Sequence, residues 1–388
     1  MRRPRRSRPC STGFGAKAEL ATYERTIDVD QWTVSSVLDE HRPLHRVAIG
    51  DERGTVVYVS STTGQIVRDT DRAERVWNWL GSTIHWIYPF QLRRHGELWT
   101  SLLTYLSVAA VISVATGAVI GVLRLRVRQR YRGSDVSPYA GAAKWHHLLG
   151  LVCLVFLGTF TFSGLMSMSP WGMFDSSSSE AEQVRRYTHG SSGTPWPTVD
   201  WRAWPPADGV KEVEWRRIAG SAYAVISRAA DDREVVMDGA RGAAALAGLR
   251  RKIAASVAAL LPNAAIVTAA PVAEYDDYYY SRHNRYRPLP AYRVTFDDAE
   301  KTWFYLDWST GAVVLRYTTA ARVQRWLYNG LHSLDFSALL RRGVLWDAIV
   351  ILLSSVGFGF AVTSVLVGWR RMARKRRFAA VSALTRQA

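Results

Sequence analysis

The segment Leu98–Leu123, LWTSLLTYLSVAAVISVATGAVIGVL, contains no charged residue. An α-helix rises about 1.5 Å per residue, so this segment is long enough to cross the ~30 Å hydrocarbon core of a bilayer. Two further stretches, His147–Met168 and Leu345–Gly368, are similarly long and nearly free of charge. The sequence therefore predicts a membrane α-helical protein with three transmembrane helices.

The distribution of positive charge predicts how these helices are oriented. The 388 residues carry a formal net charge of +17, which by itself would fit a nucleic-acid partner. The arginines, however, cluster at 2–8, 124–132 and 370–377. The last two clusters directly follow apolar segments, as in the cytoplasmic flanks of membrane helices. We therefore expect a lipid bilayer and no nucleic acid as the partner. The chain is expected to be a multi-pass protein of the cell inner (plasma) membrane, with its polar modules extracytoplasmic.

The chain also resembles itself at an offset of 247 residues (305 minus 58), so that Tyr58–Arg124 aligns with Tyr305–Arg371 without a gap. Both copies contain a Tyr-x4-Thr-Gly turn, a Trp-Leu pair, a histidine and a Leu-Trp pair at the start of the apolar segment. Apolar segments align by chance, but these landmarks would not keep one register as well. We expect a repeat of strand, turn, strand, amphipathic linker and transmembrane helix, with Gly311 at positive φ in its turn.

Short runs of alternating apolar residues predict α+β modules in the polar segments. The first module is expected to contain a short helix at Ile27–Glu40, and the second an amphipathic helix at Ala240–Leu261. The expected strands are Arg46–Gly50, Thr55–Ser60, Gln65–Arg68, Val213–Ile218, Ala222–Ser227, Ile266–Ala269, Tyr292–Phe296 and Trp303–Asp307.

The run Tyr305-Leu306-Asp307-Trp308-Ser309-Thr310-Gly311, with Arg325–Phe336 and Gly368–Arg371, resembles the PepSY-associated membrane protein family. The segment Trp145–Gly150 resembles the family's helix that opens a repeat. The resemblance implies PepSY-like modules between transmembrane helices. Family members begin with a further membrane helix, which we expect this chain to lack.

The expected organisation follows from the repeat and the resemblance together. It is a basic N-terminal tail (1–24), a first PepSY-like module (25–72), an amphipathic linker (73–97), a transmembrane helix (98–123), a basic cytoplasmic loop (124–145), a second transmembrane helix (146–168), an extracytoplasmic region with a second PepSY-like module (169–320), a second linker (321–344), a third transmembrane helix (345–369) and a basic cytoplasmic tail (370–388).

Four histidines at the ends of the apolar segments are the candidate cofactor ligands. His85 and His332 are related by the repeat, whereas His146 and His147 open the second apolar segment. Neutral imidazole ligates haem iron, and the resemblance implies relatives that are di-haem ferric-siderophore reductases. We expect haem b, held at an outer site by His85 and His332 and at an inner site by His146 or His147. The second inner ligand would come from the lacking helix or from another chain of a homo-oligomer. The alternative is that these histidines only hydrogen-bond lipid headgroups or backbone.

Three functional hypotheses are compatible with the sequence alone. The first is a haem-dependent oxidoreductase that reduces a ferric siderophore in iron uptake, with no metal site beyond the haem iron. The second is a non-enzymatic sensor or binding module for a periplasmic protein or peptidase. The third is an inactive truncated fragment of the first. Because the sequence contains no HExxH, P-loop, GxSxG or dinucleotide-binding glycine motif, hydrolase and nucleotide chemistry are not supported.

Overall fold

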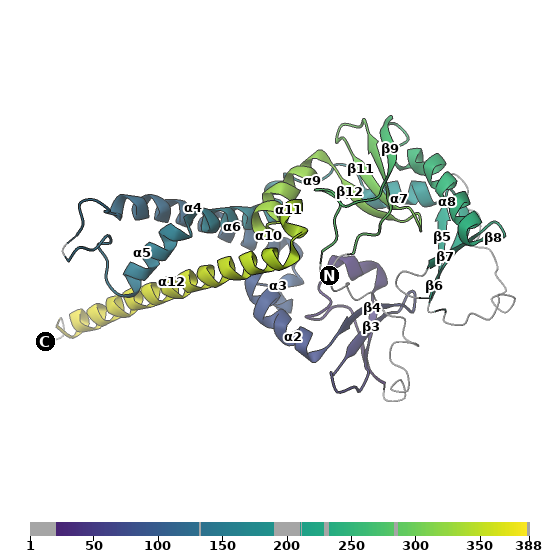
Figure 1. Ribbon diagram of the computed structural model, residues 1–388. Coiled ribbons are helices and arrows are strands. Elements are labelled where there is room, and N and C mark those ends of the chain that lie inside the picture. Colours follow the sequence, from purple (N-terminus) through teal and green to yellow (C-terminus); the bar gives the residue numbers. More distant parts are fainter. Residues whose placement is uncertain are drawn as a thin grey trace. The chain divides into compact units, whose positions relative to one another are not determined.

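The computed structural model describes residues 21–131, 133–189, 210, 212–228, 233–282 and 286–385, with side chains up to residue 373. Most of the expected N-terminal tail lies outside these residues. The chain divides into two compact units, and Figure 1 traces their elements along the sequence from purple to yellow. The sheet unit contains Met1–Trp99 and Asp175–Arg322, and the helical unit contains Thr100–Phe174 and Val323–Ala388.

The first sheet is an antiparallel meander in the order β1 (Thr22–Ile27), β2 (Leu44–Ala48), β3 (Val56–Ser60) and β4 (Ile66–Thr70). The last three strands agree with the sequence-based expectation to within two residues. The expected helix at Ile27–Glu40 is wrong, because its start belongs to β1 and only Ser36–His41 forms a short 3-10 helix, η2. The carboxylate of Asp30 accepts hydrogen bonds from the amide of Trp32 and the hydroxyl of Thr33. Such local bonds compete with helical ones.

The second and third sheets are also antiparallel. One has the order β12 (Val313–Tyr317), β11 (Trp303–Asp307), β10 (Ala291–Phe296) and β9 (Ile266–Val272). The other has the order β5 (Glu212–Ile218), β6 (Ser221–Ser227), β7 (Arg233–Met237) and β8 (Ala240–Arg241). The expected amphipathic helix is present as α8 (Gly242–Ser256), continued by the 3-10 helix η6 (Val257–Leu260). Buried apolar residues of α8, β6 and β10 share one hydrophobic core with Tyr187 of α7 (Glu180–His189).

Elements of the structure recur at the 247-residue offset. The bounds of β11 and β12 lie 247 residues after those of β3 and β4. The helices α11 (Ser337–Leu340) and α12 (Gly343–Thr385) begin 247 residues after α3 (Phe90–Arg93) and α4 (Gly96–Arg124). The turn glycines Gly64 and Gly311 both have positive φ, 71° and 68°, so the expected conformation at Gly311 is confirmed. These strands, helix starts and turn glycines therefore recur at one offset, although most of their residues differ.

A helical segment joins each meander to the long helix that follows it. We call Val76–His95 the first linker and Val323–Arg342 the second linker. The first contains the end of α2 (Arg72–Asn78), the π-helix η3 (Trp79–Thr83) and α3. The second contains the end of α9 (Thr319–Gln324), the π-helix η7 (Arg325–Gly330), α10 (Leu331–Ser333) and α11.

The two apolar helices α4 and α12 are each long enough to cross a membrane, and each contains an 18-residue stretch with a mean hydropathy of 2.3. The expected second span is not one straight helix. It is formed by α5 (Ala142–Val152) and α6 (Leu154–Ser167), which meet at Cys153 with a bend of 76°. The two halves pack on different partners, α5 against α12 and α6 against the second linker. The described residues thus contain two candidate spans, or three if the bent pair is one span.

Candidate functional site

His147 is buried in the helical unit, and both of its ring nitrogens are hydrogen-bonded. Its Nε2 lies 2.8 Å from the carbonyl oxygen of Gly121 on α4, and its Nδ1 lies 2.8 Å from the hydroxyl of Ser137. A carbonyl oxygen only accepts, so Nε2 carries the proton and Nδ1 accepts from Ser137. Both ring nitrogens are therefore used to hold α5 against α4 and the loop that joins them.

His146 is held differently, on the face of α12. Its ring stacks on Phe360 at 4.5 Å, and Nδ1 lies 3.4 Å from the Thr363 hydroxyl and 3.3 Å from the Ser364 hydroxyl. Both hydroxyls donate to the backbone carbonyl of Phe360. They must then accept from Nδ1, which places the proton there and leaves a lone pair on Nε2.

The ring of His332, in the second linker, lies on α6 in the way that the ring of His146 lies on α12. Its ring stacks on Phe160 at 4.7 Å, and its Nδ1 lies 3.0 Å from the hydroxyl of Ser163. That hydroxyl donates to the carbonyl of Phe160, so His332 also has its proton on Nδ1. Each of these two rings therefore lies on a Phe-x-x-Ser/Thr face of a helix, where residues three apart are neighbours. A histidine that ligates a metal through one nitrogen usually donates the other N–H in this way.

The positions of His146 and His332 along α12 are well separated. The indole of Trp346 donates to the carbonyl of Ser333, next to His332, at 2.9 Å. His146 contacts Thr363, so about 17 residues of α12, or roughly 25 Å, lie between the two levels. These two histidines cannot ligate the same iron atom. His85 is exposed in the first linker of the sheet unit, with its ring at 6.5 Å from that of Trp86.

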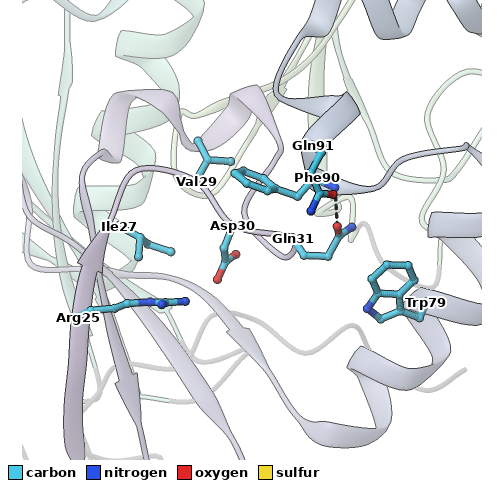
Figure 2. Close-up of a pocket in the computed structure, with 8 residues that line it drawn as sticks. All are labelled: Arg25, Ile27, Val29, Asp30, Gln31, Trp79, Phe90 and Gln91. Carbon is cyan, nitrogen blue, oxygen red and sulfur yellow. Dashed lines mark hydrogen bonds between the residues drawn. The ribbon is translucent and has the colours of Figure 1, made fainter.

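The sheet unit contains a pocket that no sequence motif indicated. Its volume is about 490 Å³. Figure 2 shows its walls, which come from β1, the segment after it, η3 and α3. The lining residues are Arg25, Ile27, Val29, Asp30, Gln31, Trp79, Phe90 and Gln91. They come from three separate parts of the sequence, so only the folded structure brings them together.

Hydrogen bonds fix two of the polar walls of this pocket. Gln31 donates to the carbonyl of Tyr88 and accepts from the amide of Phe90, at 3.0 and 2.7 Å. Asp30 accepts from the hydroxyl of Tyr58 at 2.8 Å. Burial and the Asp30 carboxylate together raise the pKa of Tyr58, so this tyrosine stays protonated as the donor.

Arg25 supplies the positive charge of the pocket. Within the described part of the chain its side chain makes no hydrogen bond or ion pair, whereas the Asp30 carboxylate is occupied by three donors. Ile27, Val29, Trp79 and Phe90 make the remaining walls largely apolar. The pocket therefore fits an anionic group attached to an apolar body.

The described residues contain no group of three or more His, Cys, Asp or Glu side chains placed to hold a metal ion. A haem would need only axial nitrogens, and the tautomers of His146 and His332 fit that role better than the tautomer of His147.

Comparison with known proteins agrees with the membrane architecture. The family model described as the PepSY-associated TM region matches residues 12–225. No curated protein matches the chain. The matched segment includes the first sheet, the first linker, α4 and both halves of the bent pair, and it covers more than half of the sequence. The chain therefore belongs to the family of membrane proteins with a PepSY-associated TM region.

Proposed function

We propose that this chain is a haem-containing oxidoreductase of the inner (plasma) membrane that reduces ferric siderophores in iron uptake. The observation that carries the proposal is the shared surroundings of His146 and His332. In both, a ring stacked on phenylalanine donates its Nδ1 proton to a hydroxyl, and in this tautomer Nε2 is the nitrogen that would ligate iron.

The two histidines would serve two haem positions, because roughly 25 Å of α12 separates their levels. A bound haem supplies a one-electron redox centre. The chain's own contribution is to fix the ring planes by stacking, to set the tautomer through the hydroxyls, and to surround each ring with apolar helix faces. The arginine clusters at 124–132 and 370–377 support an extracytoplasmic position for the sheet unit.

The proposal is tested by mixing dithionite-reduced, detergent-purified protein with a ferric siderophore under anaerobic conditions. We expect the protein to be reoxidised while a ferrous chelator traps Fe²⁺. His146→Ala and His332→Ala should each lower the haem content. His147→Gln, the matched control on the same helix, should keep its haem, because the native ring has no nitrogen left for iron. Equal haem content in all three variants would contradict the proposal.

The pocket beside Asp30 favours a second candidate, a module that binds a periplasmic partner. Its unpaired Arg25 and apolar walls fit an acidic residue next to an aromatic one. Fluorescence anisotropy with short peptides that contain an Asp-Phe or Phe-Glu pair would measure this binding. Arg25→Gln should weaken it, whereas Arg68→Gln, an exposed arginine on β4 of the same sheet, should not. Equal affinity for both variants would remove this candidate.

A further inference from the structure

The loop that joins α4 to α5, residues 125–141, folds back onto the end of α4. The hydroxyl of Tyr131 donates to the carbonyl of Arg124, the last residue of α4, at 3.2 Å. The guanidinium of Arg126 lies over the ring of Tyr131, 4.6 Å from its centre. Because these contacts hold Tyr131 near the helix end, the segment between them stays beside that end and does not extend away from it.

The second half of this loop is tied to both helices. The amide of Arg126 donates to the carbonyl of Val136 at 3.0 Å. The carboxylate of Asp135 accepts from Nζ of Lys144 on α5 at 2.6 Å. Asp135 is the only acidic residue of the loop, so the negative charge of the loop is already paired with a lysine.

The arginines of the segment 124–130 have no acidic partner. Arg124, Arg126, Arg128 and Arg130 are all exposed, and none of them forms an ion pair within the described part of the chain. The guanidinium of Arg130 reaches only the carbonyl of Ser134, at 3.4 Å. Four positive charges that the fold keeps within seven residues favour an anionic partner.

Apolar side chains lie among these arginines. Residues 123–128 read Leu-Arg-Leu-Arg-Val-Arg. Val127 is 63 % exposed, and Trp145, in the first turn of α5, is 62 % exposed. This mixture is typical of a segment in the interface of a bilayer, where arginine meets phosphate and apolar groups meet the acyl chains. A nucleic-acid duplex would match the arginines but not the apolar side chains.

We propose that the segment 124–130 is a binding site for the phosphate headgroup of an anionic phospholipid. The guanidinium groups donate to the phosphate oxygens, and Val127 contacts the adjoining acyl chains. The site differs from the general attraction of a basic loop to a bilayer, because Tyr131 keeps the arginines at the end of α4. The proposal rests on charge and packing and does not depend on haem or on the pocket of the sheet unit.

The experiment is native mass spectrometry of the full chain in detergent, titrated with phosphatidylglycerol or with the same concentrations of phosphatidylcholine. We expect phosphatidylglycerol to bind more tightly. Arg128→Gln combined with Arg130→Gln should weaken its binding about 30-fold, because each basic residue near an anionic surface contributes roughly fivefold. Arg68→Gln combined with Arg251→Gln is the charge-matched control. Both arginines are exposed in the sheet unit, so this variant should bind as the wild type does.

A second variant separates a built site from net charge alone. Tyr131→Ala keeps every arginine but removes the hydrogen bond to Arg124 and the ring under Arg126. It should weaken the binding of phosphatidylglycerol by about threefold or more.

Three results would overturn the proposal. The first is equal affinity for the two lipids, or phosphatidylglycerol binding that either the arginine variant or Tyr131→Ala leaves unchanged. The second is displacement of phosphatidylglycerol by the same concentration of inorganic phosphate, which would identify a site for free phosphate. The third is displacement by the same concentration of a short DNA duplex, which would identify a nucleic acid as the occupant.

Discussion

The Thr-Gly turns offer a matched pair of substitutions that separates backbone strain from packing. Gly64 and Gly311 have nearly the same φ, 71° and 68°, so alanine at either position costs about 1–2 kcal/mol in a left-handed conformation. The surroundings differ. A Cβ at Gly64 would meet nothing within 4 Å, whereas a Cβ at Gly311 would lie 2.5 Å from Cδ1 of Ile218 and 2.9 Å from Oη of Tyr223.

The packing contribution at Gly311 can be estimated from these contacts. Inserting a methyl group into a packed core costs about 1–3 kcal/mol, and Ile218 and Tyr223 are both buried. Gly311→Ala should therefore lower the local free energy of opening by about 2 kcal/mol more than Gly64→Ala does. Because about 1.4 kcal/mol is a factor of ten, this difference corresponds to roughly 30-fold faster amide exchange.

Hydrogen exchange measured by mass spectrometry on the full chain in detergent would report this locally. Peptides covering β11 and β12 are compared in Gly311→Ala with those covering β3 and β4 in Gly64→Ala. Each variant also controls for the other, because the unsubstituted turn should exchange as in the wild type. Equal acceleration in the two turns would refute the packing that the structure gives around Gly311.

Two further predictions concern polar groups of the sheet unit. Tyr58→Phe removes a hydrogen bond to the Asp30 carboxylate and should lower the free energy of unfolding by about 2 kcal/mol, measured by thermal unfolding. Tyr305→Phe should be nearly neutral in the same assay, because the buried Tyr305 hydroxyl has no hydrogen-bond partner among the described residues. A larger loss of stability in Tyr305→Phe than in Tyr58→Phe would contradict this. Burial raises the pKa of Glu300, but hydrogen bonds from residues 176–178 and the charge of Arg316 lower it further than burial raises it. Because the pKa of Glu300 is lower in the folded than in the unfolded chain, its ionised form stabilises the contact at any pH above the ordinary carboxyl pKa, and this stabilisation is lost as the pH falls through the folded pKa. Proteolysis at 175–179 should therefore accelerate only below about pH 4. In Glu300→Gln it should already be fast at neutral pH.

The sequence predicted well those elements whose pattern is local. The apolar segments, the strands after Leu44 and the amphipathic helix α8 all follow from hydrophobic periodicity. The bend at Cys153 was not predictable in this way, because it comes from α5 and α6 packing on different partners. Helical pattern at Ile27–Glu40 was overridden by the local hydrogen bonds of Asp30.

The candidate site was likewise predicted from the sequence only in part. The four histidines were found from the sequence because they are related by the repeat or lie at the ends of apolar segments. Their tautomers were not predictable, because these depend on hydroxyls far away in the sequence. Thr363 and Ser364 are more than 200 residues from His146, and no periodicity connects them. The pocket beside Asp30 is assembled from β1, η3 and α3, and its unpaired Arg25 looks like any exposed arginine in the sequence.

The central claim is that His146 and His332 bind haem, and the most direct measurement is a visible spectrum of the detergent-purified chain, oxidised and then reduced with dithionite. The account predicts sharp b-type haem bands in the reduced protein, lost in part when either histidine is replaced by Ala and retained in His147→Gln. A chain that is colourless as purified and stays colourless after haem is added would contradict it.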